Sequence, residues 1–258
     1  MFAHIAPLDN QDALERISDH RLLHDREYID GRWPPAASGD VFAVVDPATG
    51  AVLKRVASLD ADQGASAIDA ASLAFPAWRA RLRQERAARL RAWYELILAA
   101  KADLALLVTL EQGKPLAEAR DEIAYAASFV EWYAEEARRL GAESVASHLN
   151  DAETIVRREP VGVVGVVTPR SFPSAMLARK AAALAAGCTV VAHPSFETPL
   201  SALALAEVGA RAGLPAAAFN VVTGNPATIV EGLCADARVR AISFRTNSVL
   251  KYICFDNG

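Results

Sequence analysis

Residues 161–193 read VGVVGVVTPRSFPSAMLARKAAALAAGCTVVAH, and this stretch decides the fold. It opens with an apolar, β-branched run over residues 161–167, which is typical of a buried strand. An alanine-rich helix is predicted over residues 173–186, where Gly187 ends it, and a second apolar strand follows over residues 189–192. The order of strand, helix and strand predicts a unit of two parallel strands joined by a helix.

The same alternation continues along the chain. Helices are predicted over residues 199–212 and 227–235, and strands over residues 219–222 and 241–244. Continuous apolar strands separated by helices indicate a parallel sheet that is covered on both faces, so the fold class is a doubly wound, Rossmann-like α/β domain. Ligands bind such sheets outside the carboxyl ends of the strands. Here these ends lie near residues 168–172, 193–198, 223–226 and 245–248.

The N-terminal half is expected to contain two short hairpins followed by helices. Residues 1–24 are polar and predict a short lead-in, and the Asp30-Gly31 pair predicts a tight hairpin turn. A second hairpin is expected over residues 41–56. Apolar residues at helical spacing predict three helices, and an exposed strand precedes the sheet; these elements cover residues 60–81, 84–110, 115–140 and 154–158.

The end of the chain breaks the alternation. Residues 249–255 have the pattern of a strand, yet only about four residues separate them from the strand at 241–244. A parallel crossover needs about a dozen residues or more. This last strand is therefore expected to pair as a hairpin or to leave the sheet.

Composition excludes several classes of protein. The chain has 258 residues, of which 52% are hydrophobic and 22% charged, so a sizeable packed core is expected. A net charge of −4 offers no electrostatic footprint for nucleic acid or for an anionic membrane. No secretory signal and no apolar run of about 18 residues is found. We expect a cytoplasmic globular protein that binds neither nucleic acid nor membrane.

The three cysteines, Cys188, Cys234 and Cys254, lie far apart and share no CxxC spacing. This pattern excludes a disulfide scaffold and a zinc site, and no metal site is predicted. Each cysteine is interpreted as a small buried hydrophobic residue rather than as a nucleophile.

The first junction between strand and helix lacks the GxGxxG fingerprint of common dinucleotide sites. It reads TPRSFP at 168–173, and the second junction reads HPSFETP at 193–199. With EPVGVVG at 159–165, RKAAALAAGCTVV at 179–191 and FNVVTG at 219–224, the chain resembles the aldehyde dehydrogenase superfamily. The run LEQGKPLAEA at 110–119 is similar to the succinate-semialdehyde dehydrogenase branch.

The resemblance implies oxidation of an aldehyde to a carboxylic acid with NAD or NADP as the cofactor. In that chemistry a cysteine thiolate adds to the carbonyl, a hydride passes to the nicotinamide, and water releases the acid. By the same resemblance, the cofactor-binding positions are Thr168, Pro169, Ser171, His193, Ser195, Phe196, Gly224 and Phe244.

Several of these positions depart from the family pattern. Ser171 stands where the family has the asparagine that holds the oxyanion, and His193 replaces a lysine that contacts the cofactor ribose. Phe196 replaces a polar ribose contact, so binding of NAD or NADP is expected to be weak or lost. The alternative for His193 is a loop histidine without a ligand. Arg179 matches an arginine that binds the distal carboxylate of the substrate, and the alternative is a surface arginine.

The glutamate motif Leu-Glu-Leu-Gly-Gly and the nucleophile motif Gly-Gln-x-Cys of the family do not occur in the sequence. The resemblance therefore implies a lead-in at 1–24, an NAD(P)-binding domain at 25–248 with oligomerisation strands at 143–159, and a C-terminal oligomerisation strand at 249–258. The catalytic domain is absent from this division, and no intact catalytic residue is predicted.

Three hypotheses follow. The first is a truncated aldehyde dehydrogenase that is inactive alone. The second is an interaction module, in which residues 154–158 and 250–255 pair with complete family members to form a homo- or hetero-oligomer. The third is a dehydrogenase whose missing half comes from another chain, with a small aldehyde as its substrate.

Overall fold

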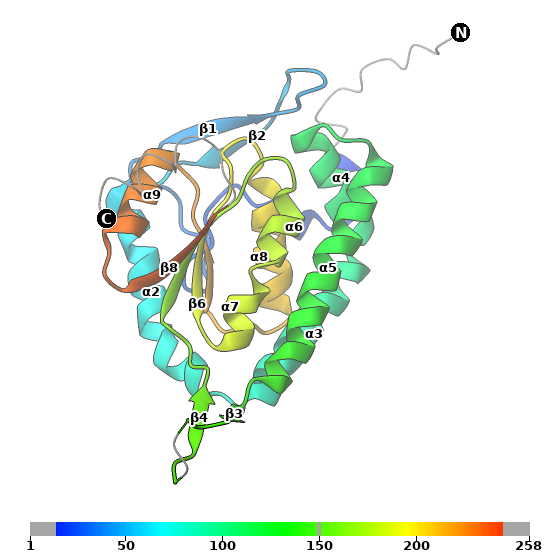
Figure 1. Cartoon of the computed structure of the whole chain (residues 1–258). Coiled ribbons are helices and arrows are strands. Elements are labelled where there is room, and N and C mark those ends of the chain that lie inside the picture. The colour runs from blue at the N-terminus through cyan, green and yellow to red at the C-terminus, as the bar shows by residue number, and fades with distance from the viewer. Residues whose placement is uncertain (1–13, 149–150, 245–258) are drawn as a thin grey trace.

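A computed structural model describes residues 14–148 and 151–244. Its centre is a parallel sheet with the strand order β7-β6-β5-β8, drawn in Figure 1. The strands are β5 (Val163–Val167), β6 (Thr189–His193), β7 (Phe219–Val221) and β8 (Val239–Phe244). Every residue of β6 and β7 is buried, whereas β8 lies at an edge and is half-exposed.

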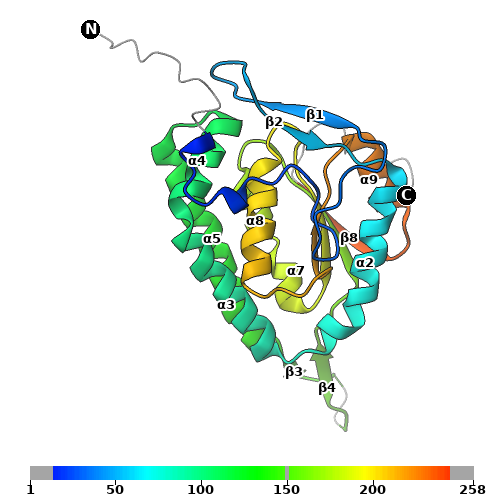
Figure 2. The same ribbon diagram turned by 180° about the vertical axis from the view of Figure 1, so that it is seen from behind.

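Helices cover both faces of the sheet (Figures 1 and 2). One face packs against α2 and α9, and the opposite face packs against α6, α7 and α8. An outer layer of helices covers α6, α7 and α8. In this layer α3 and α5 run side by side, and α4 packs against both α5 and α8. The bounds are α2 (Ala61–Ala80), α3 (Arg83–Ala99), α4 (Lys101–Gln112), α5 (Leu116–Arg139), α6 (Pro173–Ala178), α7 (Ala181–Ala186), α8 (Leu200–Arg211) and α9 (Pro226–Ala235).

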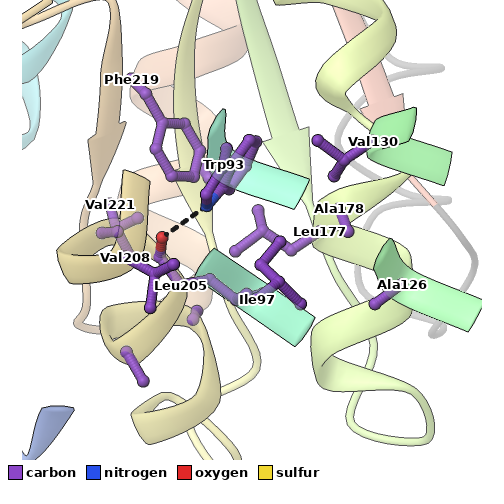
Figure 3. Packing of buried hydrophobic residues seen from close by; sticks show 14 of the residues in the cluster. Trp93, Ile97, Ala126, Val130, Leu177, Ala178, Leu205, Val208, Phe219 and Val221 are labelled. Carbon is purple, nitrogen blue, oxygen red and sulfur yellow. Dashed lines mark hydrogen bonds between the residues drawn. The ribbon is translucent and has the colours of Figure 1, made fainter. Parts of the chain in front are cut away.

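The main core lies between the sheet and the outer helices (Figure 3). Trp93 of α3 is one of the two buried tryptophans of this core: its indole ring lies 5.4 Å from the ring of Phe219, and its N–H donates to the carbonyl oxygen of Leu205 at 3.2 Å. Burial of large apolar side chains such as Trp93 and Ile97 stabilises the fold by about 1.5–3 kcal/mol each.

Two hairpins lie at opposite ends of the sheet, as Figure 1 shows. The first, β1 (Val41–Val45) with β2 (Val52–Ala57), lies near the carboxyl ends of the strands. The second, β3 (Ala142–Val145) with β4 (Thr154–Arg157), projects from the opposite end, and all of its strand residues are exposed. A short 3₁₀ turn, η1 (His20–Leu22), precedes both.

The structure confirms the parallel doubly wound sheet and several turns. Gly187 and Gly113 end α7 and α4 with positive φ, and Asp30-Gly31 forms a turn in which both residues have positive φ. These conformations are favoured by glycine, and aspartate tolerates them. In the described part of the chain, no helix combines the length and the apolar character needed to cross a bilayer.

Two helix predictions are wrong. The helix expected over residues 84–110 is broken at Ala100 into α3 and α4, and the helix expected over 173–186 is broken at Arg179-Lys180 into α6 and α7. The residues at both breaks are good helix formers, so the sequence carries no stop signal. The helices on the two sides of each break pack against different sets of neighbours: α3 and α4 both contact α5 and α8, but only α3 contacts α7, and α6 contacts α8 while α7 contacts α3 and β6.

Strand bounds also differ from the predictions. The first sheet strand begins at Val163 rather than at 161, because Gly162 has a φ of +136° that does not fit a strand. The fourth begins at Val239, two residues before the predicted start, and β4 ends at Arg157. The predictions for residues 1–13, 245–248 and the strand at 249–255 lie outside the described residues.

Candidate functional site

The carboxyl ends of the central strands bring three segments together. In the sheet register Val167 pairs with His193 on one side and with Phe244 on the other. The amide N–H of Thr168 donates to the carbonyl oxygen of His193 at 3.1 Å, which fixes the first loop against the second. Residues 168–171, 193–196 and 223–224 therefore lie along one edge, as doubly wound sheets require.

A buried ion pair supports the first loop from below. Lys114 Nζ lies 2.5 Å from Glu122 Oε2 and donates to the carbonyl oxygen of Ser171 at 3.0 Å. The other carboxylate oxygen of Glu122 accepts the N–H groups of Ser174 and Ala175 at 3.0 and 3.1 Å. Because these N–H groups belong to the first turn of α6, Glu122 caps that helix and positions the loop before it.

A second buried carboxylate caps the next helix. Glu111 accepts the N–H of Leu200 at 2.7 Å and that of Ser201 at 2.8 Å. Burial raises the pKa of Glu111 to about 8, against the opposing effect of these hydrogen bonds. The sequence motifs predict no role for Glu111, Lys114 or Glu122. The sequence does hold a signal for the two glutamates, because each lies on an otherwise apolar face of its helix. An acidic side chain at such a position is buried only when it has a hydrogen-bond or ion-pair partner.

His193 is enclosed within the fold. Its ring is 1% exposed, and Nδ1 lies 3.1 Å from the carbonyl oxygen of Val222. A carbonyl only accepts, so Nδ1 carries the proton and Nε2 keeps its lone pair. Nε2 is buried and has no hydrogen bond among the described residues. Burial lowers the pKa of His193 to about 4, so the ring is neutral at pH 7.

Phe196, in contrast, points outward. Its side chain is 51% exposed, in the loop that also carries Ser195 and Glu197. The Glu197 carboxylate forms an ion pair of 3.0 Å with Arg170. This pair links the loop after β5 to the loop after β6 across the edge of the sheet. Because both side chains are more than a third exposed, its contribution to stability is small.

Gly224 is explained by packing within the chain. Its φ is +150°, and a Cβ added there would lie 2.8 Å from the backbone oxygen of Leu59. Thr223 fixes the same approach, because its hydroxyl donates to the carbonyl oxygen of Ala57 at 2.8 Å. The connection from β2 to α2 therefore lies directly against the end of β7, and only glycine fits.

The remaining predicted positions differ in exposure. Thr168 and Pro169 are buried, and the Thr168 hydroxyl has no hydrogen bond among the described residues. Ser171 is exposed, while Phe244 is 37% exposed and is the last described residue.

Arg179 lies at the break between α6 and α7. Its side chain is exposed, and its guanidinium lies 5.2 Å from the ring of Phe129 on α5, a contact typical of a cation on an aromatic face. The neighbouring Lys180 turns toward the sheet and donates to the Ser243 hydroxyl at 2.6 Å. Burial lowers the pKa of Lys180. Only Arg179 of this pair remains available to a ligand.

The described cysteines do not reach this edge. Cys188 is buried at the start of β6, the amino end of that strand, and Cys234 is half-buried near the end of α9. Neither cysteine lies near Ser171, so the described residues provide no thiol beside the position where an oxyanion would form.

The fold and this edge define a doubly wound α/β domain of the type found in solved aldehyde dehydrogenases. The family model described as "Aldehyde dehydrogenase family" matches residues 33–251. The chain belongs to the aldehyde dehydrogenase family.

Individual relatives agree with this assignment. The NADP(+) succinate-semialdehyde dehydrogenase GabD of Escherichia coli is 48% identical over 89% of this chain and 48% of the relative. A non-phosphorylating aspartate-semialdehyde dehydrogenase of Halomonas elongata is 49% identical over 89% of this chain and 47% of the relative. A crystal structure of succinate-semialdehyde dehydrogenase from Burkholderia pseudomallei, 44% identical, matches with a TM-score of 0.90 over 93% of this chain and 50% of that chain. The chain spans about half the length of the curated relatives it matches.

The polar groups at this edge do not fit a dinucleotide well. A bound ribose needs a polar partner for each buried hydroxyl. The ring of His193 is enclosed and already bonded to Val222, and Phe196 presents only carbon atoms. Among the described residues at this edge, Nε2 of His193 and the hydroxyl of Thr168 have no hydrogen bond, but both are buried. The two positions that the resemblance assigns to the ribose therefore present one buried imidazole and one exposed apolar ring.

Proposed function

We propose that this chain is an aldehyde-dehydrogenase-type nucleotide-binding unit that binds NAD or NADP weakly and does not oxidise an aldehyde by itself. The observation that carries the proposal is the state of His193. Its ring is buried, and its Nδ1 donates to the carbonyl oxygen of Val222, so that nitrogen is not open to a ribose hydroxyl. The exposed apolar ring of Phe196 supports the same conclusion.

The chemistry of the site also supports an absence of turnover by this chain. Aldehyde oxidation of this type needs a thiolate and an oxyanion donor within about 3 Å of one carbonyl group. Ser171 has a shorter side chain than asparagine, and loss of one oxyanion donor costs about 3 kcal/mol of transition-state stabilisation. The described cysteines lie away from Ser171. The residual role is therefore in binding.

The ligand class that suits the site is a semialdehyde with a carboxylate at its far end. Arg179 is exposed beside Phe129. Its guanidinium can therefore pair with a carboxylate while the aromatic ring contacts the carbon chain of the ligand. The names of the relatives, which act on succinate and aspartate semialdehydes, support the same class.

The test is calorimetric titration of NAD⁺ and NADP⁺ into the purified chain, beside a full-length relative as a positive control. We expect a much weaker binding signal from the chain than from the control. An assay of nicotinamide reduction with succinate semialdehyde is expected to give no turnover. Turnover by the purified chain alone would overturn the proposal.

A second candidate function is association with complete family members, and the β3–β4 hairpin favours it. All of its strand residues are exposed, including Val145, Ile155 and Val156, which are 41, 54 and 42% exposed. A two-stranded hairpin is marginally stable in water, and its free edges can pair with another strand. Co-purification with a full-length relative, lost when residues 142–157 are deleted, would support this role. Retention of the complex after the deletion would exclude it.

A further inference from the structure

A cavity of about 740 Å³ lies at the amino ends of the parallel strands, the opposite end of the sheet from Thr168 and His193. It is open to solvent and is bordered by the connection between α2 and α3, the end of α5 and the base of the β3–β4 hairpin, which meet at the lower end of the molecule in Figure 2. Seven of its 15 lining residues are arginines, and Glu159 is the one acidic residue among them. We call it the arginine cavity.

Most of the arginine charge in this cavity is not balanced. Arg158 pairs with Glu143, and Arg86 bonds to backbone carbonyls. Within the described part of the chain, no ion pair is formed by the other five arginines of the lining, which are Arg79, Arg81, Arg83, Arg138 and Arg157. All five are exposed. Positive charges that share one cavity repel one another, and a bound anion relieves that repulsion.

Arg86 forms a fixed wall of the cavity. Its side chain is 5% exposed, with Nε donating to the carbonyl oxygen of Ala185 at 3.1 Å and Nη1 to that of Arg81 at 2.6 Å. Gly187 lies beside this guanidinium, and a Cβ added there would be in van der Waals contact with Cζ at 3.4 Å. Burial and the charge of Arg83 lower the pKa of Arg86. Arg86 is therefore held in place without a carboxylate partner.

The first turn of α3 adds to the positive potential. This 17-residue helix begins at Arg83, and both Arg83 and Gln84 line the cavity. The first N–H groups of a helix have no acceptor within the helix, and they carry the positive end of its dipole. The carboxylate of Glu85 is used by the N–H of Leu82. The N-terminal end of α3 and the unpaired arginines thus both favour an anion.

We propose that the arginine cavity binds a small anion that carries two or more linked phosphate groups. The guanidinium fork matches two phosphate oxygens at once, so several arginines suit a polyvalent phosphate. The volume is within the range of ordinary ligand sites. No aromatic residue lines the cavity, so no aromatic ring is available there to stack on a nucleobase. The oligophosphate group itself, free or attached to a nucleoside, is what this cavity recognises.

The test is calorimetric titration of inorganic triphosphate into the full chain at low salt. We expect saturable binding at one site per chain, weakened by added salt. The double variant R83Q/R157Q is expected to lose at least about tenfold in affinity, because it removes two charge-assisted contacts. R120Q is the matched control, since Arg120 is an exposed arginine on α5 outside the cavity lining, and it is expected to bind like the unmodified chain. Thermal melts verify that all three chains are folded.

Companion titrations distinguish the sources of the phosphate. Binding by both triphosphate and ATP, with none by adenosine, supports recognition of the oligophosphate in either form. Binding by triphosphate alone restricts the site to the free anion. Absence of saturable triphosphate binding, an unchanged affinity in R83Q/R157Q, or citrate binding as tight as that of triphosphate would each overturn the proposal.

Discussion

The ammonium group of Lys114 lies 2.5 Å from the carboxylate of Glu122, with the two side chains 9% and 1% exposed. The pair connects the outer helical layer to the loop after the first sheet strand. Through it, Glu122 holds the start of α6 and Lys114 holds the carbonyl of Ser171. The geometry of the candidate site therefore depends on Lys114 and Glu122, which are buried between the outer helices and the loop.

Replacement of Lys114 by methionine tests this dependence. The change leaves the buried Glu122 charge without its partner, so we expect the free energy of unfolding to fall by about 3–5 kcal/mol. The measurement is urea unfolding at pH 7. K114M/E122Q is expected to recover part of the loss, because glutamine keeps an acceptor for the α6 N–H groups and carries no charge. K101M is the control, since Lys101 forms no ion pair among the described residues; an equal loss in K101M would contradict the interpretation.

Two glycines provide opposite predictions. Gly224→Ala places a Cβ 2.8 Å from the Leu59 oxygen at a φ of +150°, so we expect a loss of about 1–3 kcal/mol in the free energy of unfolding. Gly232 lies within α9, and nothing lies within 4 Å of an added Cβ there. Gly232→Ala is expected to stabilise by about 0.5–1 kcal/mol through helix propensity. Chemical denaturation measures both, and destabilisation by both changes to the same degree would refute the packing argument for Gly224.

His193 predicts a loss of stability in acid. Its pKa in the fold is about 4, below the ordinary value of 6.5, so the unfolded chain binds one more proton than the folded chain between these two values. The folded state accordingly loses stability as the pH falls from about 6.5 to about 4. His193→Asn keeps a donor for the Val222 carbonyl and does not titrate. Across this range, the free energy of unfolding is expected to fall less steeply with decreasing pH for H193N than for the unmodified chain. Parallel curves would show that His193 is not the titrating group.

The sheet was predictable from the sequence, whereas the state of the site residues was not. β5 and β6 are continuous apolar runs with no polar face. Such runs are typical of strands in a parallel sheet covered on both faces, so the sequence pattern predicts their position at the centre of the sheet. The breaks at Ala100 and at Arg179-Lys180 were missed because helix-forming residues occupy them. His193 was correctly placed at the end of a strand, yet the direction of its ring depends on the Val222 carbonyl, which comes from another strand. Such a contact depends on packing between distant segments and leaves no local pattern.

Phe196 gives the most direct test of the proposed cofactor edge. Its ring is 51% exposed, and the proposed function places it beside a ribose hydroxyl that would need a polar partner. Phe196→Ser supplies a hydroxyl and removes an exposed apolar ring, so we expect NADP⁺ affinity to rise by about fivefold to tenfold, the effect of one added hydrogen bond of about 1 kcal/mol. Leu73→Ser is the control, because Leu73 is 82% exposed on α2 and its change alters surface polarity elsewhere. Calorimetric titration of NADP⁺ measures the effect, with thermal melts to verify folding. If F196S binds NADP⁺ no better than L73S does, Phe196 is not the residue that limits cofactor binding, and the enclosed ring of His193 remains as the cause.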